Sequence, residues 1–244
     1  MNEQTVSLQA PAKLTLSFRV TGVRDDGFHL IDAEMVTLDL ADLLYITRGG
    51  NGLEIVGPFA TGVSSDENNL VSRALRLCNI EAHVRIDKRI PTGGGLGGGS
   101  ADAAAILRWA AFTDLIVASR LGADIPFCMV GGHAHVQGIG EIITPMPPVA
   151  MDITLVIPPL VVSTSAVYKA WDDLGGPKAN GANDLEPAAL HVEPRLAIWR
   201  DRISDAAGMT PTLAGSGATW WIDGIHTQLA NDLPEATVLI TKTR

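Results

Sequence analysis

The sequence has few cysteines and an excess of acidic over basic side chains. Its two cysteines, Cys78 and Cys128, lack the paired spacing of zinc ligands or redox motifs. We therefore expect both to be buried thiols in a reducing cytoplasm. The chain has 18 Lys and Arg against 27 Asp and Glu, a net charge of −9. This balance argues against binding to the phosphate backbone of a nucleic acid, although it allows a local basic pocket for a small anion.

Long apolar runs are also missing. The most apolar stretch, residues 149–162, is interrupted by Asp152, Pro158 and Pro159 and is too short to span a bilayer. The first ten residues, MNEQTVSLQA, are polar where a signal peptide would have a basic end and an apolar core. The sequence predicts a globular cytoplasmic protein without a membrane partner.

Glycine, by contrast, is concentrated in one place. Residues 91–102 read PTGGGLGGGSAD, with six glycines in seven positions. An ordered glycine costs about 0.5–1 kcal/mol of extra entropy, so such a run indicates close approach of the backbone to another group. Val84, Ile86 and Ile90 predict a strand before the loop, and the segment from Ser100 has the cap and the alanines of a helix start. This setting favours an anion cradle over a flexible linker.

Two other glycine motifs fit this loop less well. Gly93, Gly95 and Gly98 satisfy G-x-G-x-x-G, but so rich a run satisfies almost any glycine spacing. The repeated strand–helix units of a doubly wound sheet are not evident around it. A Walker A loop needs a lysine before the Ser or Thr, whereas Gly99 precedes Ser100. A nucleotide-dependent oxidoreductase is therefore the remoter alternative.

Alternating apolar residues predict an α+β fold with two domains, residues 1–148 and 149–244. The first part has a strand over residues 14–20 and a helix over 69–77. The second part is predicted to contain strands over 153–157, 219–222 and 237–240 and helices over 164–171 and 196–203.

Two further features of the sequence are open to more than one interpretation. The loop 214–218 fits a hairpin turn as well as a ligand contact. His133 and His135 have the spacing of one strand face, and we interpret them as ordinary histidines rather than as a metal site.

In this order, the motifs resemble those of the GHMP kinases, the superfamily of galactokinase, homoserine kinase and mevalonate kinase. The resemblance covers nearly the whole chain. It is carried by Ala10-Pro-Ala-Lys13-Leu, Gly27-Phe-His29, Asn69-Leu-Val, Lys88 through Ser100, Gly122-Ala-Asp124-Ile-Pro-Phe, Pro158-Pro159, Ser163-Thr164, Asn183-Asp-Leu-Glu-Pro187 and Gly215-Ser-Gly-Ala-Thr219. The doubled glycine triplet and the Asn-Asp-Leu-Glu-Pro stretch are similar to the branch that phosphorylates 4-diphosphocytidyl-2-C-methyl-D-erythritol.

The resemblance implies a two-domain GHMP kinase fold, with an N-terminal ribosomal-protein-S5-domain-2-like part and a C-terminal ferredoxin-like α+β part. It implies transfer of the γ-phosphate of ATP to the 2-hydroxyl of that cytidine substrate, in the methylerythritol phosphate pathway to isoprenoid precursors. The implied cofactors are ATP and Mg²⁺, whose protein ligand cannot be identified in the sequence. The chain is expected to be a monomer or weak homodimer, and a kinase of another small alcohol is the nearer alternative.

The family match also implies the site residues. Asp124 matches the catalytic carboxylate and Lys13 its partner, whereas the residues alone would equally suggest a helix cap and a solvated strand edge. The implied nucleotide-binding residues are Asn69, Lys88, Pro91, Thr92, Gly93, Gly94, Gly95, Leu96, Gly97, Gly98, Gly99, Ser100 and Ala101. The implied substrate-binding residues are Thr15, Phe28, His29, Thr164, Tyr168, Gly215 and Ser216, with Phe28 and Tyr168 stacking on cytosine and His29 contacting its polar edge.

The sequence departs from the family pattern at several places. Thr15 stands where asparagine is usual, Phe28 where tyrosine is frequent, and Ala214 where serine is common before Gly215. The segment between Ala105 and Leu121 is shorter than in the family, which affects the expected helix lengths more than the chemistry.

Overall fold

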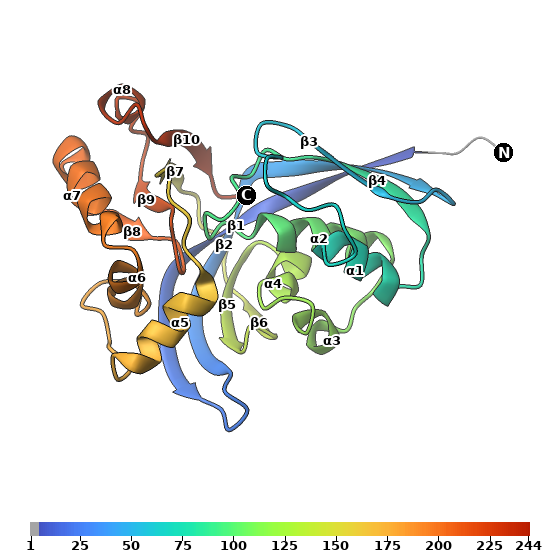
Figure 1. Cartoon of the computed structure of the whole chain (residues 1–244), viewed down its shortest axis with the longest axis horizontal. Coiled ribbons are helices and arrows are strands. Elements are labelled where there is room, and N and C mark those ends of the chain that lie inside the picture. Colours follow the sequence, from blue (N-terminus) through green and yellow to red (C-terminus); the bar gives the residue numbers. More distant parts are fainter. Residues whose placement is uncertain (1–4) are drawn as a thin grey trace.

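The computed structural model describes residues 5–244, whose strands form a six-stranded and a four-stranded sheet. Figure 1 shows the first sheet with helices α1 to α4 beside it, and the second sheet with α5 to α8 on the other side of the molecule. This arrangement is the predicted α+β fold. No helix among residues 5–244 is long and apolar enough to cross a membrane.

The first sheet is built around one long hairpin. Strands β1 (Thr5–Val23) and β2 (His29–Arg48) pair antiparallel along their length and are joined by the turn at Gly27, which has a φ of +85°. The remaining strands are β3 (Leu53–Val56), β4 (Ala82–Asp87), β5 (His133–Gly138) and β6 (Ile142–Pro145).

The order of these strands excludes a parallel βαβ unit around the glycine loop, on which a dinucleotide-binding site depends. β4 pairs with residues 43–48 of β2 and β5 pairs with residues 31–36, while β1 occupies the other edge of β2. Within residues 5–244, β4 and β5 do not pair with each other. The glycine loop after β4 therefore does not open a paired parallel βαβ unit, which removes the sequence argument for an oxidoreductase.

The helix after the glycine loop is the most buried helix of the first part. Helix α2 (Gly98–Trp109) buries every residue from Ala101 to Leu107, because its alanines allow close packing against the sheet and neighbouring helices. It begins two residues before the predicted start at Ser100. Gly97 is the N-cap, with a φ of +68° that a residue with a side chain rarely adopts.

Three shorter helices accompany α2, and each has a cap or a proline that explains where it begins. They are α1 (Leu70–Leu77), capped by the Asn69 side chain, α3 (Leu115–Ser119), capped by Asp114, and α4 (Ile125–Val130), with a proline in its first turn. The α1 helix matches the predicted range of 69–77.

The second sheet has the strand order β10-β7-β9-β8 and contains the strands predicted from alternation. Its strands are β7 (Asp152–Ile157), β8 (Thr212–Leu213), β9 (Trp220–Asp223) and β10 (Thr237–Lys242). Its helices are α5 (Thr164–Asp173), α6 (Glu186–Val192), α7 (Arg195–Ala207) and α8 (Leu229–Asp232).

The end of the chain returns to the first sheet. Thr243 forms an isolated bridge with Leu38, and the backbone N–H of Arg244 donates to the carbonyl of Thr37 at 2.9 Å. These contacts connect the end of the chain to the first sheet. The division of the chain into two domains at residue 148 stays a prediction.

The two cysteines differ in their burial. Both thiols are free, but Cys128 is buried whereas Cys78, at the end of α1, is only half-buried. The expectation of two buried thiols was therefore wrong for Cys78, because the C-terminal end of α1 is partly open to solvent. Burial raises the pKa of the Cys128 thiol to about 12, so this group is not a reactive thiolate.

Candidate functional site

Lys13 and Asp124, which are far apart in the chain, meet in the structure. Lys13 lies within β1 rather than before it, and its side chain is only 6% exposed. Its Nζ lies 3.3 Å from Asp124 Oδ2 and donates to Thr15 Oγ1 at 3.2 Å. Asp124 is in the N-cap position of α4, but its side chain makes no capping hydrogen bond. The carboxylate, 32% exposed, therefore remains available to a ligand.

The glycine loop passes directly beside Lys13. The backbone N–H of Lys13 donates to the carbonyl of Leu96 at 3.0 Å. A Cβ on Gly97 would lie 2.8 Å from Lys13 Cγ, and one on Gly95 would lie 2.2 Å from the carbonyl oxygen of Ala214. Glycine is therefore required at these two positions by contacts with the protein itself. A Cβ on Gly93 would meet nothing within 4 Å, which leaves that part of the loop open to a ligand.

A cavity of about 500 Å³ lies over the glycine loop and the start of α2. Most of the predicted nucleotide-binding residues line it. They are Asn69, Lys88, Pro91, Thr92, Gly93, Gly94, Gly95, Leu96, Gly97, Gly98, Gly99 and Ser100, and Ala101 is buried directly behind them. The N-terminus of a twelve-residue helix faces this cavity, an environment that favours phosphate groups.

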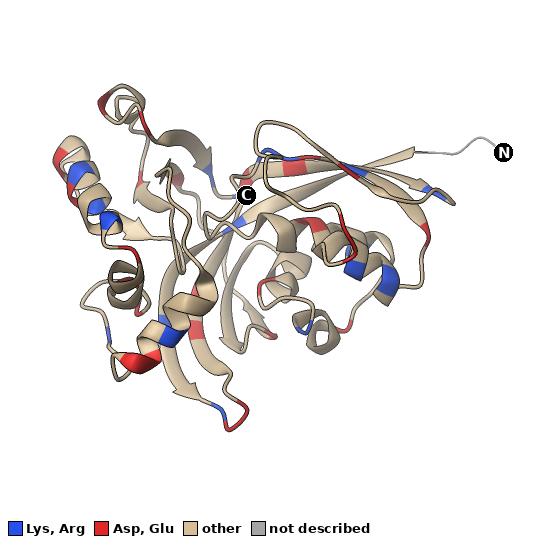
Figure 2. Ribbon diagram, in the orientation of Figure 1, with Lys and Arg blue, Asp and Glu red and all other residues tan. Residues whose placement is uncertain are grey.

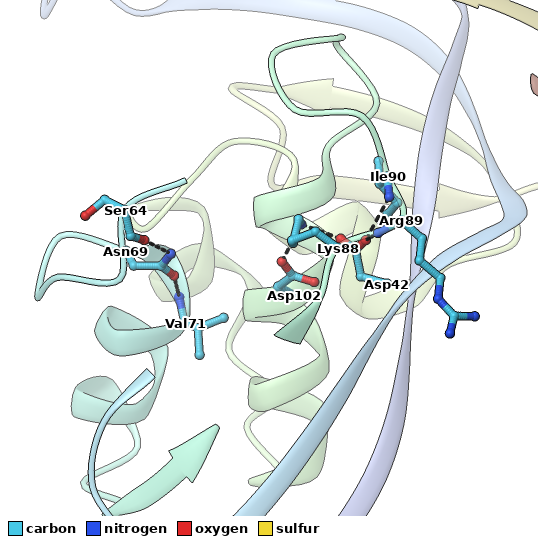
Figure 3. Close-up of polar contacts among 8 residues, drawn as sticks. All are labelled: Asp42, Ser64, Asn69, Val71, Lys88, Arg89, Ile90 and Asp102. Carbon is cyan, nitrogen blue, oxygen red and sulfur yellow. Dashed lines mark hydrogen bonds and ion pairs between the residues drawn. The ribbon is translucent and has the colours of Figure 1, made fainter. Parts of the chain in front are cut away.

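Two of these residues have their polar groups engaged within the chain (Figure 3). The Asn69 side chain accepts a hydrogen bond from the N–H of Val71 at 2.9 Å and donates to the carbonyl of Ser64 at 2.7 Å. The Lys88 ammonium donates to Asp42 and to Asp102. Direct contacts of Asn69 and Lys88 with a nucleotide stay predictions, and the structure gives both residues a role in shaping the cavity wall.

Lys88, Asp42 and Asp102 form a buried cluster, here called the Lys88 cluster, that connects the two ends of the glycine loop. Asp42 of β2 is fully buried and accepts from the backbone N–H groups of Arg89 and Ile90 before the loop, while Asp102 follows the loop in α2. Burial alone would lower the pKa of Lys88, but the charges of Asp102 and Asp42 outweigh it and the pKa is raised. Burial raises the pKa of Asp102 against the opposing effect of Lys88. Sequence reasoning missed both carboxylates.

A second cavity, of about 650 Å³, lies between β1, the β1–β2 turn and α5. It is lined by both proposed catalytic residues and by all the predicted substrate-binding residues, namely Lys13, Asp124, Thr15, Phe28, His29, Thr164, Tyr168, Gly215 and Ser216. Gly95 and Ser100 line this cavity and the one over the glycine loop. The two cavities therefore meet next to the Lys13–Asp124 pair.

The stacking of Phe28 and Tyr168 on cytosine stays a prediction, and the structure shows how the two rings are placed. Tyr168 packs against His29, with ring centroids 4.7 Å apart, whereas Phe28 is 57% exposed near the hairpin turn. The reason is local, because the turn directs Phe28 outward and His29, as the first residue of β2, inward. Phe28 and Tyr168 line the same cavity without pairing with each other.

The loop 214–218 is both a hairpin connection and part of the site. It joins the antiparallel strands β8 and β9. A Cβ on Gly215 would lie 3.8 Å from Lys13 Nζ, and Ser216 Oγ lies 2.9 Å from Thr164 Oγ1. Asn183, buried in the Asn-Asp-Leu-Glu-Pro stretch, donates to the carbonyls of Leu213 and Gly215. Asn183 is not among the predicted site residues, although its motif is one of those that carry the resemblance.

Charges are interspersed over the molecule. Figure 2 shows acidic and basic segments side by side on α5 and α7. His133 and His135 pair with Glu34 and Asp32, at 2.7 and 2.8 Å. Across residues 5–244, no group of three or more His, Cys, Asp or Glu side chains could hold a metal. Binding of an anionic ligand must therefore rely on local groups, namely backbone N–H groups, the α2 N-terminus and Lys13.

Comparison with known proteins identifies the same region. Residues 69–132 match the family model of the GHMP kinases N terminal domain. The chain is 40% identical over 240 residues to the 4-diphosphocytidyl-2-C-methyl-D-erythritol kinase of Ruegeria pomeroyi, with 86% of this chain and 85% of the relative covered. It is 38% identical over 229 residues to the enzyme of the same name from Paracoccus denitrificans, with 86% and 84% covered.

A solved structure supports the match across the whole chain. The crystal structure of a 4-(cytidine 5'-diphospho)-2C-methyl-D-erythritol kinase superposes with a TM-score of 0.78 at 27% identity, covering 98% of this chain and all of that one. The mevalonate kinase of Methanococcus jannaschii superposes with a TM-score of 0.58 at 12% identity, which shows a common fold.

Proposed function

The chain belongs to the 4-diphosphocytidyl-2-C-methyl-D-erythritol kinase family of the GHMP kinases, and from this premise we propose that it transfers the γ-phosphate of ATP to the 2-hydroxyl of that cytidine substrate. The observation that carries the proposal is the position of the Lys13–Asp124 pair. It lies where the cavity over the glycine loop meets the cavity that contains His29 and Tyr168. A phosphoryl group can pass from one ligand to the other at that junction.

The proposed chemistry assigns one role to each member of the pair. Asp124 accepts the proton of the 2-hydroxyl while that oxygen bonds to the γ-phosphorus and the bond to the β-phosphate oxygen breaks, releasing ADP. Lys13, 3.3 Å from the carboxylate, helps to orient it and stabilises charge on the transferring group. Thr15 Oγ1 accepts a hydrogen bond from the ammonium, at 3.2 Å.

We also propose a magnesium ion bound together with ATP. Ser100 lines both cavities, and its hydroxyl is an oxygen ligand of the kind that this hard cation prefers. Ser100 would hold the ion together with the phosphate oxygens. The ion would neutralise phosphate charge.

The proposal is tested by ADP release over a panel of alcohols. With ATP and Mg²⁺ present, we expect turnover with 4-diphosphocytidyl-2-C-methyl-D-erythritol and background rates with mevalonate, homoserine and galactose. A higher kcat/KM for one of the other alcohols would instead assign the chain to a kinase of that alcohol.

Gly97→Val is expected to raise the KM for ATP and to lower turnover, each by at least about tenfold. The new Cβ would lie 2.8 Å from Lys13 Cγ, and the φ of +68° is unfavourable for a β-branched residue. Steady-state kinetics with varied ATP measures the effect. Gly208→Val is the matched control, because Gly208 has a φ of +72° at the end of α7 and nothing within 4 Å of its Cβ position. Unchanged ATP kinetics in folded Gly97→Val would refute the cradle.

Phe28→Ala and Tyr168→Ala are each expected to weaken CDP binding about fivefold or more while ATP affinity stays nearly unchanged. Tyr168 should have the larger effect, because its ring also supports His29. Calorimetric titration with CDP and with ATP separates the two affinities. Leu174→Ala, an exposed position at the end of α5, serves as the control. If both aromatic variants bind CDP as the parent does, the cytidine assignment is wrong.

Cytoplasmic location and a monomer or weak homodimer stay predictions. Two free thiols and the use of ATP support the cytoplasm. Light scattering of the purified chain distinguishes a monomer from a dimer.

A further inference from the structure

His29 is held by three side chains of a single helix. Tyr168, Trp171 and Asp172 all lie on α5, while His29 is the first residue of β2. The His29 ring lies 4.7 Å from the Tyr168 ring, and it meets the Trp171 ring edge-on at 5.5 Å and 82°. Trp171 is itself fixed by a 2.9 Å hydrogen bond from its indole N–H to the carbonyl of Pro177. The histidine ring therefore has little freedom to turn.

The third contact determines where the ring carries its proton. His29 Nε2 lies 2.8 Å from Asp172 Oδ1. An ionised carboxylate can only accept a hydrogen bond, so Nε2 must carry the hydrogen. In neutral imidazole, Nδ1 then has a lone pair and can only accept. The His29 side chain is 11% exposed and lines the second cavity, and within residues 5–244 its Nδ1 has no partner.

Cytosine and uracil differ in the hydrogen-bonding group that they present to the protein. Cytosine carries an amino group, a donor, at the position where uracil carries a carbonyl oxygen, an acceptor. A histidine that can only accept at Nδ1 forms a hydrogen bond with the amino group of cytosine. It forms none with the carbonyl oxygen of uracil, which is left without a partner. A site that binds one polar group discriminates strongly against the analogue that lacks it.

We propose that Asp172 is a positioning residue that fixes the His29 tautomer and thereby makes the site select cytidine over uridine ligands. The inference rests on the proposed cytidine substrate. Asp172 acts through His29 and is itself 48% exposed, at the rim of the cavity. An ion pair with so exposed a carboxylate adds little to the stability of the fold. The main effect of Asp172 is therefore on the tautomer of His29.

The test compares CDP and UDP binding by calorimetry in the full-length parent, Asp172→Asn and Asp173→Asn. An amide can donate to Nε2 and so allow the other tautomer, which donates from Nδ1. We expect Asp172→Asn to lower the CDP-to-UDP affinity ratio by at least about tenfold. Asp173→Asn removes the same charge from the next residue, whose partner is the exposed Lys169, and should keep the parent ratio.

The other outcomes separate the inference from the function on which it rests. A parent that prefers CDP, with the same ratio in Asp172→Asn, overturns the role of Asp172 and leaves the kinase proposal standing. A parent that binds neither ligand, or binds both equally, overturns the cytidine assignment as well. Nitrogen-15 NMR of the parent gives an independent test, because we expect His29 to be protonated at Nε2 and bare at Nδ1. Protonation at Nδ1 overturns the inference even if Asp172→Asn fails to fold.

Discussion

Asp124→Asn is expected to lower the rate of phosphoryl transfer by at least about 10² while changing substrate affinity by less than about tenfold. The substitution keeps the size and shape of the side chain but removes the base and its charge. The carboxylate is free to act in this way, because it makes no capping hydrogen bond to α4 and is 32% exposed beside Lys13. Single-turnover transfer at saturating ATP and cytidine substrate measures the loss.

Lys13→Met should cause a comparable loss, because the two groups act as a unit. Asp201→Asn is the control for loss of one negative charge, since Asp201 is a 66% exposed surface residue paired with Arg200. The assignment is wrong if Asp124→Asn transfers phosphate within about threefold of the parent, a limit set well below the range of general-base effects.

Lys88→Met is expected to lower the free energy of unfolding by about 3–5 kcal/mol. The substitution leaves the carboxylates of Asp42 and Asp102 facing each other in the interior without their shared cation. Both carboxylates are almost fully buried, so water cannot replace the lost ammonium. Urea unfolding followed by circular dichroism measures the change.

The adjacent residue offers a matched control. Arg89 pairs with Asp87 at 2.8 Å, but its side chain is 50% exposed, so Arg89→Met should change stability by less than about 1 kcal/mol. A Lys88→Met protein as stable as the Arg89→Met protein would contradict a structural role for the cluster and would favour Lys88 as a nucleotide contact alone.

The regular elements were predictable because their patterns are local. The stripe of Leu196, Trp199 and Ile203 indicated α7, and all three side chains are buried. The Asn69 cap marked the start of α1. The site required more than periodicity, because Lys13 and Asp124 lie on different elements and only the family resemblance paired them in advance.

Long-range contacts of single side chains could not be predicted. Asp42, Lys88 and Asp102 come from β2, from the residue after β4 and from α2, and no local pattern joins them. Likewise, Asp172 resembles any other exposed helix carboxylate until the fold brings α5 against the β1–β2 hairpin (Figure 1). The predicted phosphate contacts explain the glycine run only in part, because glycine is required at positions 97 and 95 by packing against Lys13 and Ala214.

Phosphorus NMR of the reaction product tests the central claim most directly. The 2-carbon of the proposed acceptor bears a methyl group and no hydrogen, whereas its 1- and 3-carbons bear hydrogens. We predict that the chain, with ATP, Mg²⁺ and 4-diphosphocytidyl-2-C-methyl-D-erythritol, yields ADP and one new phosphomonoester signal without three-bond coupling to a proton. A signal split by such a proton would place the phosphate on another hydroxyl, and no new signal would contradict the proposed activity.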